Sequence, residues 1–356
     1  MQLKKIAKKI LKLGVPYGIL LIYNKIRPSR RINYDFHSIY GKYYFPHYNN
    51  SHSLPQSYPD AYNKDGRKID FFFIHDEHLA HSVYSDSKYF QYDRYNFGLD
   101  THFYTHQKML EVMGKPLRKY GMLIEAEIIC PNDYLIFERN PGLEKNFDKI
   151  FTYSDDILQK LPNSRYVPYG ITPWYKNFSP DNYYEKTKNI SMVASNKKMV
   201  PLHEYRNAVA MQCKTNRLAD IYGTFDGGQY CDILEPFKDY RFSIVIENEL
   251  TAYGFTEKIT NCFAAMTIPV YLGATRINNI FNPDGIIQFN MKDNIEKILK
   301  GLCKKSYEER VDAVIDNFNK VNINKSAFDI MYESYIQRDV GKLNPGQLIK
   351  AACINF

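Results

Sequence analysis

The sequence predicts an α/β protein made of two Rossmann-like, parallel-sheet domains. The chain has 356 residues, of which 44% are apolar, enough for two domains that each bury a core. Short apolar runs typical of buried strands alternate with segments of helical period. The alternation begins near residue 67, is interrupted by the proline-containing stretch "ITPWYKNFSPDN", and then starts again.

The first 31 residues hold the positive charge of the chain. The formal net charge is +8, yet these residues contain nine Lys/Arg and no Asp/Glu, which leaves 38 basic against 39 acidic groups elsewhere. A neutral body argues against nucleic-acid binding.

The same segment predicts a basic amphipathic helix, with Leu3, Ile6 and Ile10 on one face and lysines on the other. Its longest apolar run, residues 19–23, is too short for the roughly 20 residues of a membrane span. We expect residues 1–31 to lie on an anionic membrane surface. The alternative is a helix packed on the protein's own body or on a partner.

Six cysteines are scattered without C-x-x-C spacing, which is typical of a reducing compartment. We therefore expect free thiols and a cytoplasmic location, peripheral on the inner face of the cell membrane.

Residues 32–66 are rich in Tyr, Pro, Ser and Asn and are interpreted as a linker or surface wrap. Residues 67–172 form the predicted first domain. In it "KIDFFFIHD" reads as a buried strand and "THFYTHQKMLEVMGK" as a helix closed by Gly114 and Pro116. The remaining predicted strands are "YGMLIEAEI", "DYLIF", "KIFTYS" and "SRYVPYG".

Residues 173–330 form the predicted second domain, and residues 331–356 a closing helix. The predicted strands are "NISMVAS", "ADIYGT", "RFSIVIEN", "IPVYLG" and "GIIQFN". The predicted helices are "HEYRNAVAMQC", "TEKITNCFAAM", "NIEKILKGL" and "YEERVDAVIDNF". Ligands of parallel-sheet domains bind beyond the carboxyl ends of the strands, so we expect a cleft between two such domains.

The run "TEK" at residues 256–258 marks the change from a polar loop to a helix. The Thr256 hydroxyl can cap the helix, whose free N–H groups and dipole favour an anion. Lys258 adds a full positive charge, and the Glu257 carboxylate can accept hydrogen bonds from two ribose hydroxyls. The pattern predicts a nucleoside diphosphate site; the alternative is an ordinary capped surface helix.

A longer pattern around this tripeptide resembles the bacterial-type members of glycosyltransferase family 10, the alpha-1,3/4-fucosyltransferases. It comprises Ile246-Glu247-Asn248, Thr256-Glu257-Lys258 and "IPVYLG" from residue 268. Upstream, "VASNKKMVPLHEYRNAV" is similar to the family's strand, S-N loop and arginine-bearing helix. The resemblance spans residues 188–290.

This resemblance implies a GT-B fold with GDP-fucose as donor substrate. Arg206 and Lys258 would hold the diphosphate, Glu257 the ribose, and Asn248 would lie close to the donor. The family usually has a tyrosine two residues before the threonine, where this chain has Gly254. The nearest ring that could bind the donor is that of Tyr253. The missing tyrosine affects the predicted identity of the donor sugar more than the predicted binding of the nucleotide.

An inverting transfer also needs a base from the first domain. Glu127 best fits the family's position, after a strand and shortly before a proline, and Glu125 is the alternative. Both would lie on one side if the strand continues. They could also be exposed charges at a strand end.

Asp93, Arg94 and Asn96 lie among aromatic residues and are candidate acceptor ligands, although a plain surface loop fits as well. Histidines in "HDEHLAH" and "THFYTH" raise the question of a metal site, but they lack cysteine partners and an H-E-x-x-H motif. The chain also lacks a D-x-D pair. We therefore expect no metal site and no essential divalent cation.

The resemblance to family 10 implies an inverting glycosyltransferase, and we expect it to move fucose from GDP-fucose to a hydroxyl of a surface glycan. The acceptor would be of O-antigen or capsule type and could be lipid-linked, which would suit the basic segment. One alternative is an enzyme of the same fold that uses another nucleotide sugar as donor. The other is a non-catalytic protein that binds a nucleotide sugar or a glycan.

Overall fold

The structure is a computed structural model that describes residues 69–74, 90–93, 101–110, 116–174, 186–322, 327–337 and 341. The predicted membrane-binding segment (1–31) and the linker (32–66) lie outside the described residues. So do Arg94, Asn96, the histidines of "HDEHLAH" and most of the predicted closing helix.

The chain divides into two compact units. The N-terminal unit runs to Glu125 and also contains Asn132–Thr152 and Lys160–Arg165. The C-terminal unit contains the rest of the chain from Tyr166 together with Ala126–Pro131 and Tyr153–Gln159. These last two short segments precede Tyr166 in the sequence but pack with the C-terminal unit.

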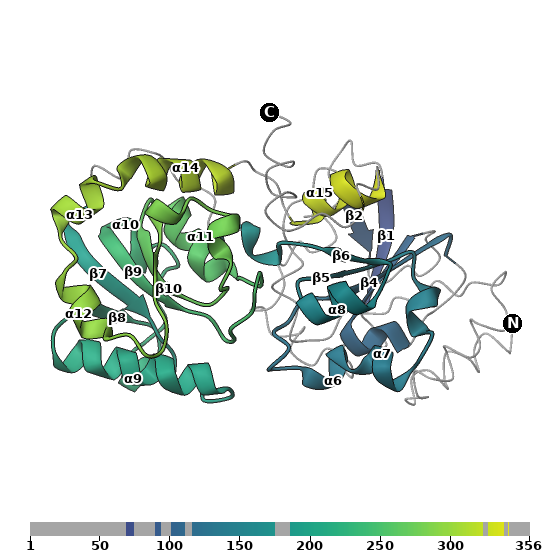
Figure 1. Ribbon diagram of the computed structural model, residues 1–356, viewed down its shortest axis with the longest axis horizontal. Helices are drawn as coiled ribbons and strands as arrows, with labels where there is room; N and C mark the ends of the chain where they lie inside the picture. The colour runs from purple at the N-terminus through teal and green to yellow at the C-terminus, as the bar shows by residue number, and fades with distance from the viewer. Residues whose placement is uncertain are drawn as a thin grey trace, which may run out of the picture. The chain divides into compact units, whose positions relative to one another are not determined.

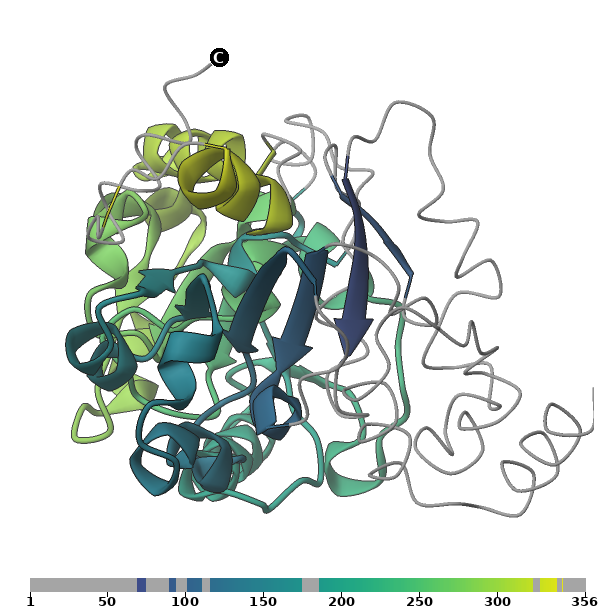
Figure 2. The same ribbon diagram turned by 90° about the vertical axis from the view of Figure 1, so that its right-hand side faces the viewer.

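The N-terminal unit is built on a six-stranded sheet of order β2-β1-β3-β4-β5-β6. Its pairings from β2 through β5 are parallel, with Phe72 opposite His102 and Tyr104 opposite Gly121. These strands, dark blue to teal in Figure 2, lie side by side. Their bounds are β1 Ile69–Ile74, β2 Phe90–Asp93, β3 Thr101–Thr105, β4 Arg118–Leu123, β5 Lys149–Thr152 and β6 Ser164–Tyr166.

The helix predicted from "THFYTHQKMLEVMGK" is wrong for its first part. Thr101–Thr105 forms the fully buried strand β3, and a 3-10 helix covers only His106–Leu110. Threonine and aromatic residues favour a pleated, buried environment, which outweighs the helical spacing of the two histidines. His106 adopts a φ of 51°, so the backbone turns sharply where β3 ends.

Two further predictions in this unit need correction. "DYLIF" is not a strand, because it contributes to the short helices α6 (Pro131–Tyr134) and α7 (Ile136–Arg139). A short apolar run cannot be assigned to strand or buried helix by periodicity alone. Strand β4 stops at Leu123, so Glu125 and Glu127 do not share one side of a continuing strand.

The C-terminal unit is built on a five-stranded, fully parallel sheet of order β11-β10-β9-β7-β8. The central strand β9 and its neighbour β10 are almost completely buried, as expected for strands covered on both faces. The strands are β7 Lys188–Val193, β8 Asp220–Tyr222, β9 Tyr240–Ile246, β10 Ile268–Leu272 and β11 Ile287–Gln288. The prediction of two parallel-sheet α/β units is confirmed.

Helices cover both faces of this second sheet. Figure 1 shows α9 (Pro201–Thr215) on one side and α11 (Glu257–Ala264) with α14 (Val311–Asn322) on the other. One cluster of buried apolar side chains joins the sheet to α9, α12 and α14. The remaining helices are α8 Asp155–Lys160, α10 Glu235–Lys238, α12 Ile295–Lys300, α13 Lys304–Glu308 and α15 Ala327–Met331, which a π-helical turn continues to Ile336.

A buried lysine joins three segments at the amino ends of the strands. The ammonium of Lys186 lies 2.6 Å from Ala265 O, 3.0 Å from Phe237 O and 3.0 Å from Thr267 Oγ1. These acceptors belong to the ends of α10 and α11 and to the turn before β10. Carbonyl and hydroxyl acceptors satisfy the charge, and they fix α11 against the sheet.

Within the described ranges Cys213, Cys231, Cys262 and Cys303 are free thiols, as predicted; Cys353 lies outside these ranges. No helix in these ranges is both long and apolar enough to cross a bilayer.

Candidate active site

Polar residues follow the central strand of the second sheet at its carboxyl end. Strand β9 ends at Ile246, and Glu247, Asn248 and Glu249 come directly after it. The Glu247 N–H donates to Leu272 O at 2.9 Å, so the first of these residues is still held by β10. The loop therefore starts from a fixed point at the edge where ligands of parallel sheets bind.

Glu247 is a buried carboxylate that fixes the start of helix α11. Only 2% of Glu247 is exposed, and it accepts hydrogen bonds from Thr256 N at 3.0 Å and Thr256 Oγ1 at 2.7 Å. Thr256 is the N-cap residue of the helix, as predicted, with its hydroxyl 3.4 Å from Lys258 N. A Cβ on Gly273 would lie 2.5 Å from Glu247 Cγ, so glycine there leaves room for this carboxylate.

Lys258 lies beside that carboxylate with part of its side chain exposed to solvent. Its ammonium is 3.3 Å from Glu247 Oε2 and 3.9 Å from Glu257 Oε1, and 30% of the side chain is exposed. Burial acts to lower the pKa of Lys258, but the two carboxylates outweigh it, so the pKa is raised above its usual value. The ammonium is therefore charged at neutral pH.

Arg206 extends from α9 to the same strand end. It is 8% exposed, and its Nη2 donates to Asn248 Oδ1 at 2.9 Å and to Glu247 O at 3.4 Å. Its Nε is buried without a hydrogen-bond partner among the described residues. Burial lowers the pKa of Arg206 while Glu247 and Glu257 oppose this. A buried guanidinium with an unsatisfied N–H favours binding of an anion.

His203, one turn before Arg206, fixes the orientation of Asn248. Met199 N donates to His203 Nδ1 at 3.2 Å, so the ring proton is on Nε2, which lies 3.0 Å from Asn248 Oδ1. Burial lowers the pKa of His203, and the positive charges of Arg206 and Lys258 add to this effect. The neutral imidazole and Arg206 both donate to one amide oxygen, which leaves the Asn248 amide N–H groups for a ligand.

Glu257, the first residue of α11, belongs to the same group, and 21% of its side chain is exposed. The structure thus brings together four of the predicted donor residues, namely Arg206, Asn248, Glu257 and Lys258. Two cations, two carboxylates and an oriented amide surround the start of a capped helix, which is a suitable environment for a diphosphate.

Tyr253 is placed differently from this cluster. Its ring packs against Tyr166 and lies 5.6 Å from the Arg276 guanidinium, and its hydroxyl accepts from Asn279 Nδ2 at 3.4 Å. The contacts of Tyr253 within the described part of the chain therefore include none of the four donor residues.

Glu127, the first candidate base, lies in the C-terminal unit beside the loop that follows β9. Its N–H is 3.1 Å from the Tyr153 hydroxyl and 3.3 Å from Glu249 Oε1, and its Oε2 accepts from Ser154 Oγ at 3.3 Å. The loop after β9 carries Asn248, a predicted donor residue, next to Glu249. Glu127 is therefore held by the same loop as a predicted donor ligand.

Glu125, the alternative base, is anchored in the N-terminal unit. Its N–H donates to His106 Nε2 at 3.2 Å, and its carbonyl oxygen accepts from the Tyr134 hydroxyl at 2.6 Å. His106 Nδ1 lies 2.8 Å from Asp133 Oδ2, which fixes the proton on Nδ1. These contacts hold the backbone where β4 ends.

Only one of the three predicted acceptor ligands lies within the described residues. Asp93 is the last residue of β2, whereas Arg94 and Asn96 lie outside the described residues. No group of three or more His, Cys, Asp or Glu side chains within the described ranges is arranged to hold a metal ion.

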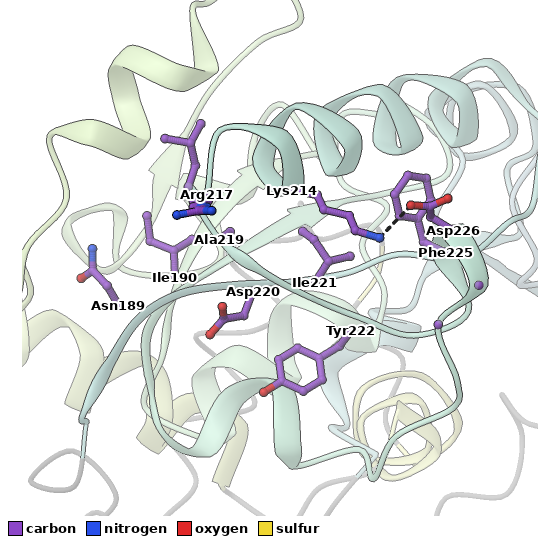
Figure 3. Close-up of a pocket in the computed structure, with 13 residues that line it drawn as sticks. Asn189, Ile190, Lys214, Arg217, Ala219, Asp220, Ile221, Tyr222, Phe225 and Asp226 are labelled. Atoms are coloured by element: carbon purple, nitrogen blue, oxygen red, sulfur yellow. Dashed lines mark hydrogen bonds and ion pairs between the residues drawn. The ribbon is translucent and has the colours of Figure 1, made fainter.

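A separate cavity of about 810 Å³ lies along the edge strand β8 (Figure 3). Lys214 and Asp226 form an ion pair of 2.7 Å at one side of it. None of the predicted donor residues lines this cavity, and nothing in the sequence indicated it.

Four residues of the site were not assigned a role from the sequence: Glu247, His203, Glu249 and Tyr153. Glu247 was visible in the motif that precedes Asn248, and its burial explains why a carboxylate occurs there. His203 had a helical signal, because it lies three residues before Arg206 on α9. Glu249 and Tyr153 gave no signal, since their roles depend on contacts 122 and 26 positions away from Glu127.

Part of the chain is similar to known proteins. Residues 183–310 match the family model described as Glycosyltransferase family 10 (fucosyltransferase) C-term. A Mus musculus protein named 4-galactosyl-N-acetylglucosaminide 3-alpha-L-fucosyltransferase 9 is 26% identical over 171 residues, covering 46% of this chain and 45% of that protein. The chain thus matches about half the length of this curated relative.

Two solved structures align with this chain at TM-scores below 0.5. A crystal structure of alpha1,3-fucosyltransferase with GDP gives a TM-score of 0.46 at 14% identity, covering 77% of this chain and 97% of that one. A structure of alpha1,3-fucosyltransferase with GDP-fucose gives 0.42 at 16% identity, with 84% and 96% covered. The matched residues include Arg206, Asn248, Glu257 and Lys258, and over residues 183–310 this chain is similar to glycosyltransferase family 10, the fucosyltransferases.

Proposed function

We propose that this protein is an inverting, GT-B-type glycosyltransferase that moves fucose from GDP-fucose to a hydroxyl of a surface glycan. The observation that carries the proposal is the cluster of Arg206, Asn248 and Lys258 at the start of α11. Arg206 and Lys258 would bind the diphosphate, and Glu257 the ribose hydroxyls.

In the proposed reaction the acceptor oxygen attacks the anomeric carbon of fucose while the bond from that carbon to the phosphate oxygen breaks. The acceptor proton goes to the Glu127 carboxylate, and GDP leaves with the additional negative charge. Arg206 and Lys258 stabilise that charge as it develops. Because two side-chain cations serve this purpose, the proposal requires no divalent metal.

The acceptor is proposed by class. The mouse relative is named for transfer to a 4-galactosyl-N-acetylglucosaminide, which makes such a disaccharide the first acceptor to assay. A lipid-linked O-antigen or capsule unit is the proposed natural acceptor. The basic residues 1–31 would hold the enzyme on the cytoplasmic face of an anionic membrane.

Calorimetric titration with GDP, UDP and CMP, followed by GDP-fucose and GDP-mannose, tests the donor. The proposal predicts selective binding of GDP and tighter binding of GDP-fucose. Preference for UDP or CMP would favour the alternative of a family fold with another nucleotide sugar. Binding of GDP-fucose without release of GDP, with any acceptor or with water, would favour a non-catalytic binding protein.

Glu127→Gln tests the chemistry. Loss of a general base lowers kcat by roughly 10²–10⁴-fold. The Kd for GDP should stay within about twofold of wild type, because the substitution leaves the charges of Arg206 and Lys258 in place. Unchanged turnover would remove Glu127 from the mechanism and leave Glu125 as the candidate.

A further inference from the structure

The segment Ala126–Pro131 follows the N-terminal sheet in sequence but packs with the C-terminal unit. It carries Glu127, and its backbone N–H groups point to acceptors in that unit. We propose that Glu249 and Tyr153 are positioning residues that hold Glu127 beside the loop that follows β9 and carries Asn248. The proposal rests on the proposed function, in which Glu127 is the base.

Glu249 uses both carboxylate oxygens to hold the backbone of this segment. Oε1 accepts from the Glu127 N–H at 3.3 Å, and Oε2 accepts from the Ile128 N–H at 3.1 Å. An ionised carboxylate only accepts hydrogen bonds, so it matches two adjacent backbone donors. A glutamine would offer one oxygen and direct its NH₂ group at the other donor.

Tyr153 connects the two glutamates. Its hydroxyl donates to Glu249 Oε1 and accepts from the Glu127 N–H at 3.1 Å. The Tyr153 ring lies directly over Gly254, where a Cβ would come within 2.4 Å of its Cδ2 atom. Gly254 therefore makes room for the ring that supports the base.

Ser154, the residue after Tyr153, contacts the side chain of Glu127. It is buried, and its hydroxyl donates to Glu127 Oε2 at 3.3 Å. Backbone and carboxylate of Glu127 are thus both fixed by residues of the C-terminal unit.

Glu249 also links the base to donor binding through the chain itself. It directly follows Asn248, whose amide oxygen is held by Arg206 and His203. One short loop after β9 therefore carries a donor ligand and the support for the base. A misplacement of 1 Å can cost about 10²-fold in rate, so this link sets the geometry of proton removal.

The test uses Glu249→Gln and Tyr153→Phe in the full chain, each alone and in a Glu127→Gln background. Release of GDP from GDP-fucose is followed with a 4-galactosyl-N-acetylglucosaminide as acceptor, and GDP affinity by calorimetry. Each single variant should lower kcat by about 10–10²-fold, with KM for GDP-fucose and Kd for GDP within about twofold of wild type. Residues that act through Glu127 should have little further effect once Glu127 is replaced.

Glu309→Gln is the matched control, because the side chain of Glu309 is 63% exposed and makes a surface ion pair with Lys305. Unchanged kcat in both single variants would overturn the proposal. An equal loss of rate in the Glu127→Gln background would also overturn it, since the residues would then act independently. If wild type itself releases no GDP, the proposed function fails first, which is a different result from either of these.

Discussion

The Glu247 carboxylate lies 3.3 Å from the Lys258 ammonium and is itself 2% exposed. This contact joins the end of the central strand β9 to the first turn of α11. It places a cation at the helix start, where the dipole alone already favours an anion. The same carboxylate accepts hydrogen bonds from the Thr256 hydroxyl and N–H. One buried group therefore orients both the helix cap Thr256 and the Lys258 ammonium.

Replacing Glu247 by Gln should destabilise the protein and weaken GDP binding. The amide has one oxygen for three donors, so at least one buried donor loses its acceptor, at a cost of about 1–3 kcal/mol. The Lys258 ammonium also loses its nearest negative charge and its fixed position. Urea unfolding and calorimetric titration with GDP measure the two effects. Unchanged stability would show that Glu247 does not hold the cap, and Glu309→Gln serves as the exposed control.

His203 should make stability fall at acidic pH. Burial lowers the pKa of His203; the hydrogen bond to Asn248 opposes this, while the charges of Arg206, Lys197 and Lys258 reinforce it. Because the unfolded histidine binds protons more readily, its contribution is present above about pH 6.5 and is lost as pH falls through the folded pKa. The free energy of unfolding of wild type should therefore fall more between pH 7.5 and 5 than that of His203→Gln. Equal losses would contradict the assignment of a neutral, buried His203.

Gly254→Ala should disturb the support of Glu127. The new Cβ would lie 2.4 Å from Tyr153 Cδ2 and 2.8 Å from Thr251 Oγ1, which forces the ring to move. Overpacking of this kind costs about 1–3 kcal/mol, and kcat should fall with the displacement of the Tyr153 hydroxyl.

Gly301→Ala is a suitable control for Gly254→Ala. Its nearest contact would be 3.3 Å away and its φ is −80°. A smaller loss of stability for Gly254→Ala in a Tyr153→Ala background would confirm that the two positions compete for one space. Full additivity would contradict that explanation.

The second sheet and the capped, charged start of α11 could be predicted from the sequence because their signals are local, whereas Arg206 and Asn248 were singled out by the family resemblance. Strands β9 and β10 are continuous apolar runs, and the Thr256 cap lies next to the charges that it orients. Arg206 and Lys258 are brought together by two strand-to-helix connections of one parallel sheet. The topology of such sheets places these connections at a common edge.

The contacts that hold Glu127, the proposed base, could not be predicted in the same way. They depend on where β4 stops, and element boundaries are the weakest part of a sequence reading. Their residues come from three separate segments: Glu127, Tyr153 and Glu249. Two elements of the N-terminal unit were assigned wrongly for a related reason: the strand Thr101–Thr105 was predicted as a helix, and the helical "DYLIF" as a strand. Buried strands and short buried helices have the same apolar composition.

Tyr253→Phe tests whether that tyrosine binds the donor sugar, as the sequence predicts, or only stabilises the fold. Its hydroxyl lies 3.4 Å from Asn279 Nδ2 and its ring lies near Arg276. Within the described residues it contacts none of the four predicted donor residues of the cluster at the start of α11. From these contacts we expect a loss of about 0.5–1.5 kcal/mol in stability and unchanged Kd values for GDP and GDP-fucose.

The difference between those two Kd values is the informative measurement. A tyrosine that contacts fucose would weaken GDP-fucose binding in the variant without affecting GDP, because only the sugar would lose a contact. Parallel titrations of wild type and Tyr253→Phe with both ligands therefore separate the two roles. A selective loss for GDP-fucose would show that the ring reaches the donor despite Gly254, and that the side chain leaves Asn279 when the donor binds.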